Sequence, residues 1–171
     1  MVNKTLPNVP VKIDDYRLKE YYGHGKATEF LCNLIECSNG LVIQKLVTDR
    51  LLRKGYSVVL NDDTQDYYDC TIGKQLVEIR RTTKKQGGLY LYMGNTSRST
   101  NTEASRQEKV MKMINGGYLL TRVMNNTGRL LMYWLPTMEL VKAFDERCFG
   151  CTGINIVDLN ERFNLDIPLV K

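Results

Sequence analysis

Histidine is nearly absent from this sequence, because the chain of 171 residues contains a single one, His24. No metal site made of several histidines can therefore be built, which excludes zinc and iron centres of that kind. The sequence also lacks any apolar run of about 18 residues, the length that a membrane-spanning helix needs. Its first residues contain no apolar stretch of the sort that secretory signal peptides carry. These absences predict an intracellular protein that has no membrane partner.

Cysteine is present in an odd number, five, which does not suggest a framework of disulfides and fits a reducing setting. Cys148 and Cys151 form a CxxC pair. Zinc would need two further ligands, and the spacing of Cys32 and Cys37 within a predicted helix is poor for that purpose. A redox role would place the pair at the start of a helix that follows a strand. We therefore interpret these cysteines as ordinary buried thiols.

The composition is that of an ordinary globular domain, with 43% apolar and 25% charged residues. A chain of this length can bury one sizeable core. Residues 1–25, which include Pro7 and Pro10, are expected to form an N-terminal arm, and residues 26–171 a single domain. The formal net charge of +5 weakly favours polyanions, such as nucleic acids, as binding partners.

The spacing of apolar residues predicts an alternation of helices and strands. Helices are expected at residues 15–22, 26–37, 41–54 and 102–114, with a short one at 138–144. Strands are expected at residues 56–60, 67–72, 75–82, 118–124 and 129–135, with residues 89–92 continuing the same sheet. Residues 94–101 have the polar composition of a mobile loop, and the apolar beat of residues 153–171 predicts a tail that packs on the domain. The expected fold class is α/β, a mixed β-sheet flanked by helices.

The stretch of residues 66–85, DYYDCTIGKQLVEIRRTTKK, carries the residues that are most suited to chemistry. Asp69 precedes a short strand and a hairpin turn, and the strand after the turn carries Glu78 and Arg80. Because side chains alternate along a strand, Glu78 and Arg80 point to one face and the residues between them to the other. If Asp69 lies beside them, two acids and a cation meet, an arrangement that suits a divalent metal acting on a phosphodiester.

Three segments resemble the PD-(D/E)XK, or restriction-endonuclease-like, nuclease superfamily: GLVIQKLVTDRLLRKGYSVV at residues 40–59, DYYD at 66–69 and VEIRRTTKK at 77–85. The family pattern is a helix, a GY-x-V strand, an aspartate and a Glu-x-Lys strand. The resemblance covers residues 26–135, and its layout is similar to that of small Holliday-junction resolvases and phage-type endonucleases. It implies a restriction-endonuclease-like core in the order of two helices, three strands, a helix and two strands.

The resemblance also implies a role for each matching position. Asp69 would bridge the metal, and Glu78 would be the second acidic ligand of the same ion. The family's helical glutamate, which helps to order a metal-bound water, is matched either by Glu29 or by Gln44, of which Gln44 fits the layout better. Asp66 could replace Asp69 if the strand register is shifted.

Arg80 takes the place of the family lysine. A lysine can lose a proton, whereas an arginine stays protonated and acts as a planar clamp on phosphate. The resemblance implies Mg²⁺ or Mn²⁺ as the metal, since the ligands are hard oxygen atoms. Phosphate contacts are expected from five basic residues: Arg80, Arg81, Lys84, Lys85 and Arg98. Three more on the following helix could extend this track, although a solvated helix face is the commoner outcome: Arg106, Lys109 and Lys112.

The first functional hypothesis is a Mg²⁺- or Mn²⁺-dependent endonuclease that hydrolyses DNA as a homodimer, with RNA left open as a substrate. The alternative is a nuclease-fold module that has lost catalysis and binds nucleic acid or a protein partner. Gln44 and Arg80 favour this alternative, because both depart from the family pattern. A protein-interaction domain with a basic surface is a third class. Four tyrosines could stack on bases, although aromatic residues that pack within a sheet are more usual: Tyr67, Tyr68, Tyr90 and Tyr92.

Overall fold

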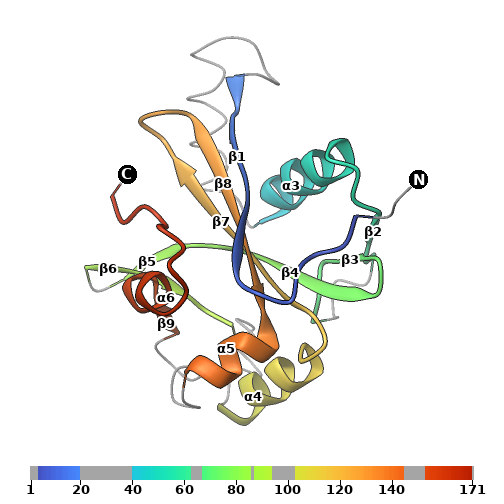
Figure 1. Cartoon of the computed structure of the whole chain (residues 1–171), viewed down its shortest axis with the longest axis vertical. Helices are drawn as coiled ribbons and strands as arrows, with labels where there is room; N and C mark the ends of the chain where they lie inside the picture. The colour runs from blue at the N-terminus through green and yellow to red at the C-terminus, as the bar shows by residue number, and fades with distance from the viewer. Residues whose placement is uncertain are drawn as a thin grey trace.

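The computed structural model describes residues 4–19, 40–62, 67–85, 87–93, 103–144 and 153–170, with the backbone alone at Leu41 and at residues 103–106. This part of the chain is a mixed α/β structure built on a sheet of six strands and a smaller sheet of three strands (Figure 1). No helix within the described ranges is long and apolar enough to cross a membrane.

The six-stranded sheet joins segments from both ends of the chain. Its strands are, in spatial order, β1 (Val11–Arg17), β8 (Arg129–Pro136), β7 (Gly117–Met124), β4 (Gln75–Arg81), β3 (Cys70–Ile72) and β2 (Val58–Leu60). All neighbours are antiparallel except β4 and β7, which are parallel. The smaller sheet has the order β5 (Thr83–Lys85), β6 (Gly88–Leu91) and β9 (Ile154–Asn155).

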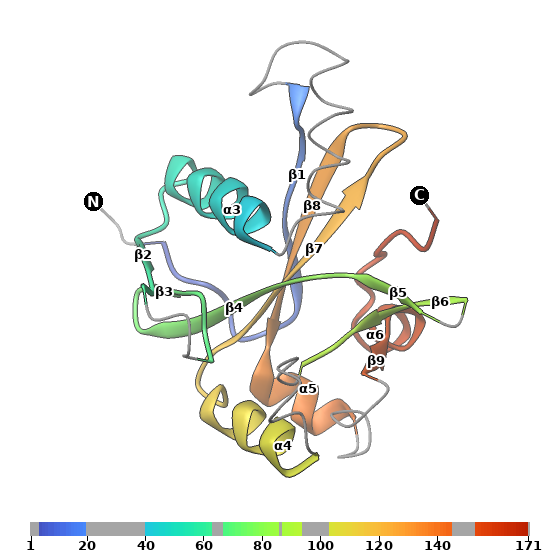
Figure 2. The same ribbon diagram turned by 180° about the vertical axis from the view of Figure 1, so that it is seen from behind.

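Four helices pack around these strands in the described part of the chain: α3 (Leu41–Arg53), α4 (Glu103–Lys112), α5 (Thr137–Ala143) and α6 (Ile156–Phe163). In two opposite views α3 lies on one side of β4, beside β1, and α4 and α5 lie on the other side of β4 (Figures 1 and 2). Alternation along β7 divides the core into two clusters. Leu119 belongs to the cluster under α3, whereas Tyr118 and Leu120 belong to the cluster under α4, α5 and α6.

Several expectations from local sequence are confirmed. The helix predicted over residues 41–54 is α3, and Gly55 follows it with φ +85°, the left-handed conformation that closes helices. The hairpin from β3 to β4 turns at Gly73, and β7 and β8 form the second hairpin. The tail packs on the domain as predicted, because Ile156, Leu159 and Ile167 are buried in the cluster that also contains residues of β7 and β8.

Three expectations are wrong. The helix predicted over residues 15–22 does not form at 15–17, which belong to β1 and pair with β8. The strand expected to be buried at residues 56–60 is the sheet edge β2, where Val59 and Leu60 are 63% and 55% exposed. Residues 89–92 do not continue the main sheet, because β6 belongs to the smaller one. The predicted boundary at residue 25, the helix at 26–37 and the loop at 94–101 lie outside the described residues.

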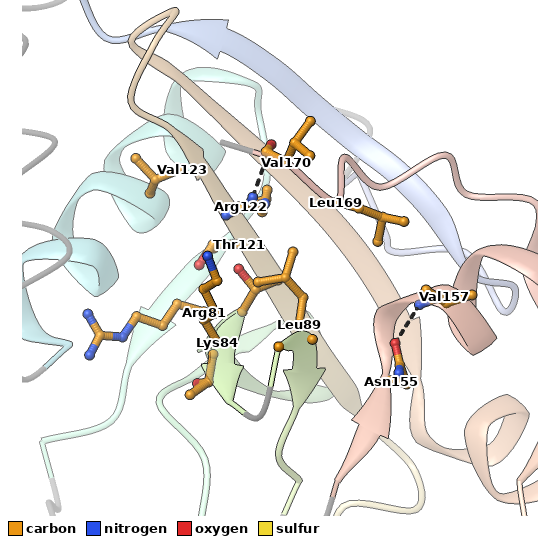
Figure 3. Close-up of a pocket in the computed structure, with 14 residues that line it drawn as sticks. Arg81, Lys84, Leu89, Thr121, Arg122, Val123, Asn155, Val157, Leu169 and Val170 are labelled. Carbon is orange, nitrogen blue, oxygen red and sulfur yellow. Dashed lines mark hydrogen bonds between the residues drawn. The ribbon is translucent and has the colours of Figure 1, made fainter.

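A pocket with a volume of about 810 Å³ lies between the smaller sheet, β7 and the C-terminal residues (Figure 3). Arg122 of β7 is buried there and donates hydrogen bonds to the carbonyl oxygens of Pro168 (3.0 Å) and Val170 (3.2 Å). Leu169 and Val170 form part of the wall. The buried guanidinium therefore holds the end of the described chain against the sheet.

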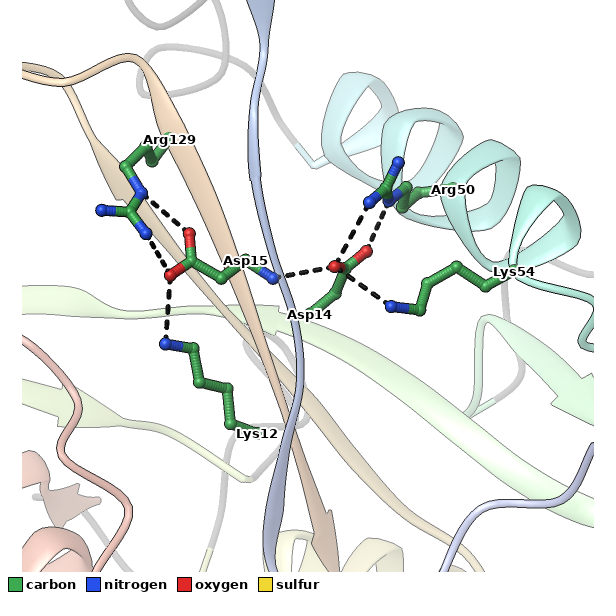
Figure 4. A network of polar contacts seen from close by, with 6 residues as sticks. All are labelled: Lys12, Asp14, Asp15, Arg50, Lys54 and Arg129. Atoms are coloured by element: carbon green, nitrogen blue, oxygen red, sulfur yellow. Dashed lines mark hydrogen bonds and ion pairs between the residues drawn. The ribbon is translucent and has the colours of Figure 1, made fainter. Parts of the chain in front are cut away.

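Asp14 ties β1 to α3 (Figure 4). Its buried carboxylate pairs with Arg50 and with Lys54 Nζ (3.1 Å), both on or just after α3, and accepts a hydrogen bond from the backbone N–H of Asp15 (2.9 Å). Burial opposes ionisation of Asp14, but these hydrogen bonds outweigh it and hold the pKa below its ordinary value. The neighbouring Asp15 forms a second set of ion pairs, with Arg129 and Lys12.

The substitution Asp14→Asn removes the negative charge that pairs with Arg50 and Lys54. We expect the free energy of unfolding in urea at pH 7 to fall by about 1–3 kcal/mol, the range for hydrogen bonds to charged groups. Because the pKa of Asp14 is lowered by folding, its contribution is complete above the unfolded pKa of about 3.9 and is lost as the pH falls through the folded pKa. The difference between wild type and variant should therefore shrink in acid. Asp49→Asn, an exposed change on the same helix, is the control, and an equal loss in both variants would contradict the assignment.

Candidate active site

Asp69 lies at the point where α3, β3 and β4 meet. Its backbone N–H donates to Val77 O (2.9 Å), and its carbonyl oxygen accepts from Asn61 N–H (2.9 Å), so the main chain is fixed on both sides. One carboxylate oxygen, Oδ2, accepts the Ile79 backbone N–H (2.7 Å), and the other, Oδ1, accepts a short hydrogen bond from the Gln44 side-chain amide. The side chain of Asp69 thereby joins helix α3 to strand β4.

The packing of α3 explains why Gln44 reaches this point. Ile43, Leu46, Val47 and Leu51 are buried in the cluster that lies under the helix. Gln44 stands at the border of that apolar face and is half-buried. Burial of the apolar stripe therefore fixes the rotation of α3 and directs the Gln44 amide toward Asp69.

Glu78 is the second acid of the site and is 8% exposed. Its Oε1 atom accepts from Arg80 (2.8 Å) on the same strand and from Lys109 Nζ (2.9 Å) on α4. The alternation expected for β4 is present, since Val77 and Ile79 pack in the cluster under α3. A buried carboxylate is tolerated here because two cations share it.

Lys109 is the residue whose position sequence reasoning missed, because it was grouped with the solvated face of its helix. The side chain is only 11% exposed. It precedes Val110, which is buried under the sheet at 2% exposure. The connection after α4 is tight: a Cβ at Gly116 would lie 2.1 Å from Leu76 O, and one at Gly117 would lie 2.5 Å from Leu135 O. Two successive glycines thus let the end of α4 approach β4 closely enough for Lys109 to reach Glu78.

The pKa values of Asp69 and Lys109 are shifted from their ordinary values. Burial, with the charge of Glu78 adding to it, raises the pKa of Asp69 to about 6. Burial also lowers the pKa of Lys109, and the neighbouring charge of Arg80 acts in the same direction, while Glu78 opposes the shift. An acid and a base whose pKa values move toward neutrality side by side are typical of sites that bind ions or exchange protons.

The structure brings together four of the predicted site residues: Gln44, Asp69, Glu78 and Arg80. Three further predicted residues, all of them exposed, lie farther along the same run of chain, at the end of β4 and in β5: Arg81, Lys84 and Lys85. The remaining predicted site residues, Glu29, Asp66 and Arg98, fall outside the described residues, as does the CxxC pair of Cys148 and Cys151. The pocket of Figure 3 is separate from this site, since neither Asp69 nor Glu78 lines it.

The residues that meet here suit a hard divalent cation in kind. Asp69 and Glu78 offer carboxylate oxygens and Gln44 can offer an amide oxygen, the ligand types that Mg²⁺ and Mn²⁺ prefer. Histidine, cysteine and acidic residues do not form a group of three or more anywhere in the described ranges. A cation would therefore have to complete its coordination with water or with a phosphate of the substrate.

The raised pKa of Asp69 predicts that this residue costs stability at neutral pH. We expect Asp69→Asn to increase the free energy of unfolding by about 1–3 kcal/mol at pH 8, since one pKa unit corresponds to about 1.4 kcal/mol. The cost of ionising the buried acid is fully present above its folded pKa of about 6 and disappears below the unfolded pKa, so the gain should vanish near pH 4. Urea unfolding at pH 8 and at pH 4 measures the difference in the free energy of unfolding between wild type and variant. The exposed Asp62→Asn is the control, and a variant that is less stable than wild type at pH 8 would refute the assignment.

Comparison with known proteins adds no relative to this description, because no family model, curated protein or solved structure matches the chain. The site consists of two carboxylates, a neutral amide and two cations, which come from α3, β4, α4 and the residue that precedes β3.

Proposed function

We propose that this chain is a Mg²⁺- or Mn²⁺-dependent endonuclease that hydrolyses phosphodiester bonds in DNA. The observation that carries the proposal is the juxtaposition of Asp69, whose pKa is raised to about 6, with Glu78 and with the buried amine of Lys109. Phosphodiester hydrolysis needs a metal held by acids and a nearby cation that faces the phosphate. The three side chains supply these groups from neighbouring elements.

The order of elements supports the resemblance to PD-(D/E)XK nucleases. From α3 onward the chain runs through β2, β3 and β4 of the six-stranded sheet, then through β5 and β6 of the smaller sheet, and by way of α4 into β7 and β8. Apart from β5 and β6, this succession agrees with the implied order of two helices, three strands, a helix and two strands from its second helix onward; the first helix, expected at residues 26–37, lies outside the described residues. The parallel pairing of β4 with β7 sets Glu78, in the middle of β4, opposite Tyr118 at the start of β7, the strand that follows α4.

Each residue of the site has a distinct task in this proposal. Asp69 and Glu78 would hold the ion, and the Gln44 amide orients Asp69 from the side of α3. When bound, the metal supplies a Lewis acid for the phosphate and an activated water. Arg80 remains protonated and offsets negative charge on the phosphate.

Lys109 supplies what Arg80 cannot. An amine with a lowered pKa can hold or release a proton beside the reacting groups, whereas a guanidinium cannot. The lysine that the family pattern carries on the strand is, in this proposal, delivered by helix α4 instead. The departure at Arg80 is then compensated by a residue 29 positions later in the chain. A homodimer would carry two such sites, one for each strand of a duplex.

A second candidate function is a nuclease-fold module that binds nucleic acid without cutting it. The observation that favours it is that Arg80 and Lys109 both contact Glu78 Oε1, at 2.8 and 2.9 Å. A metal would have to displace at least one of these ion pairs. If both cations keep Glu78, the site carries no catalysis, and phosphate is contacted by the exposed Arg81, Lys84 and Lys85 farther along the chain.

Cleavage of supercoiled and branched DNA, in Mn²⁺ and in EDTA, tests the enzymatic proposal. We expect metal-dependent nicking by the wild type and none by Glu78→Gln. Lys109→Ala should lower the single-turnover rate by about 10²–10³-fold, within the range for loss of a general acid or base. Lys142→Ala, an exposed lysine on α5, is the matched control and should cleave at the wild-type rate.

Two further readouts separate the candidates. Circular dichroism establishes that each variant is folded, and thermal melting with and without Mn²⁺ reports metal binding through the stability it adds. Binding of DNA without cleavage and without a Mn²⁺-induced shift would select the non-catalytic module. A Lys109→Ala variant that cleaves as fast as wild type would remove Lys109 from the mechanism.

A further inference from the structure

The smaller sheet continues directly from the strand that carries the candidate active site. Only Thr82 separates β4 from β5, and both views show β5 extending the course of β4 (Figures 1 and 2). From Glu78 to Lys85 the chain spans seven residues, or roughly 23 Å at the rise of an extended strand. A ligand that follows this run of chain would therefore reach both regions.

One face of the smaller sheet is apolar and covered. Leu89 and Leu91 of β6 are buried in the same cluster as Ile156 and Leu159 of α6. Because side chains alternate along a strand, Tyr90 and the following Tyr92 lie on the other face. The cluster beneath α6 accounts for the leucines and leaves the tyrosines without a packing role in the core.

The two tyrosines form a half-buried aromatic surface. Their ring centroids are 6.2 Å apart. Each ring also lies against a glycine: a Cβ at Gly88 would be 3.0 Å from Tyr90 Cε2, and one at Gly153 would be 3.1 Å from Tyr92 Cδ1. With no side chain beneath them, both rings can lie close to the backbone of the sheet, with their planes inclined to each other by 42°.

Positive charge lies beside these rings. The Lys85 ammonium is 5.9 Å from the centre of the Tyr92 ring, and its side chain is exposed. The register places Lys85 opposite Gly88 and Thr83 opposite Tyr90, so both share the tyrosine face. The residues of β5, β6 and β9 include no aspartate or glutamate.

We propose that Tyr90 and Tyr92, flanked by Lys85, form a stacking site for unpaired nucleotides of a DNA strand. Aromatic rings beside cations bind single strands because bases stack on the rings while the cations contact phosphates. Bases inside a duplex are already stacked on each other and cannot use such a surface. Resting on the proposed nuclease function, the site restricts the substrate to DNA with an unpaired segment close to the cut, such as a single strand, a flap or a branch.

Fluorescence anisotropy in EDTA tests this site without any catalysis. The probes are fluorescein-labelled oligo(dT) of 15 nucleotides, the same length of oligo(U), and a blunt 15-base-pair duplex. We expect the wild type to bind oligo(dT) more tightly than the duplex. The double variant Tyr90→Ala/Tyr92→Ala should lose roughly ten- to hundred-fold in affinity for oligo(dT), since stacking contributes about 1–3 kcal/mol per base. Its affinity for the duplex should stay within about two-fold.

The matched control is Tyr90→Phe/Tyr92→Phe, which keeps both rings and should bind oligo(dT) within about three-fold of wild type. Circular dichroism shows whether the alanine variant folds. If it does not, Lys85→Glu decides, because this exposed change leaves the rings in place: a loss of five-fold or more on oligo(dT) supports the site. Wild-type affinity in that variant, or in a folded alanine variant, overturns it. Tighter binding of oligo(U) than of oligo(dT) overturns the assignment to DNA.

The stacking site and the nuclease proposal can fail separately. Glu78→Gln should bind oligo(dT) like wild type while cleaving nothing. Intact binding of oligo(dT), combined with no cleavage of any substrate in Mn²⁺, supports the stacking site and refutes the nuclease. Metal-dependent cleavage of duplex DNA by a wild type that binds oligo(dT) no better than duplex supports the nuclease and refutes the stacking site.

Discussion

The buried carboxylate of Asp69 is the constraint on which the candidate site depends. It accepts hydrogen bonds from the Gln44 amide on α3 and from the Ile79 backbone on β4, so it holds a helix and a strand in register. Burial of this charge beside Glu78 is unfavourable by itself, as the raised pKa of Asp69 shows. Arg80 and Lys109 offset the two acids. The buried acids therefore lower the stability of the folded protein, and a bound cation would remove part of this electrostatic repulsion. Functional sites often reduce stability in this way.

Lys109 shows that this balance depends on topology and not on a local motif. The acids come from one hairpin, but the lysine arrives through a parallel crossover, which brings residues 31 positions apart within 2.9 Å. The approach is close because Gly116 and Gly117 have no side chains to meet Leu76 O and Leu135 O. These glycines set the distance between the helix and the strand, and thereby the charge balance of the site.

The sequence predicted the elements whose structure is determined locally, which include α3 with Gly55 after it, the β3–β4 hairpin and the β7–β8 hairpin. It failed where the partner is remote. Residues 15–17 form a strand because β8, more than a hundred positions later, pairs with them. The exposure of Val59 follows from the place of β2 at the sheet edge, which no local pattern encodes. Gln44, Asp69, Glu78 and Arg80 could be named in advance because they lie near one hairpin and one adjacent helix. Lys109 could not, because its burial depends on how α4 docks.

The separation of β5 and β6 from the main sheet explains why one run of chain can carry two kinds of surface. Both faces of β4 are covered. The negative charge of Glu78 is therefore offset by the positive charges of Arg80 and Lys109 within a largely buried environment. Beyond Thr82 the strand leaves β7 and pairs with β6, and among the described residues the apolar cluster under α6 covers the leucine face of the smaller sheet. The opposite face is then able to carry Lys85 and two partly exposed tyrosine rings without any desolvation of charge. Because the two sheets diverge, one extended segment carries a buried acid–base cluster on β4 and, next to it, a solvated aromatic and basic surface on β5 and β6. This order suits a DNA strand that binds along β5 and leads toward Glu78.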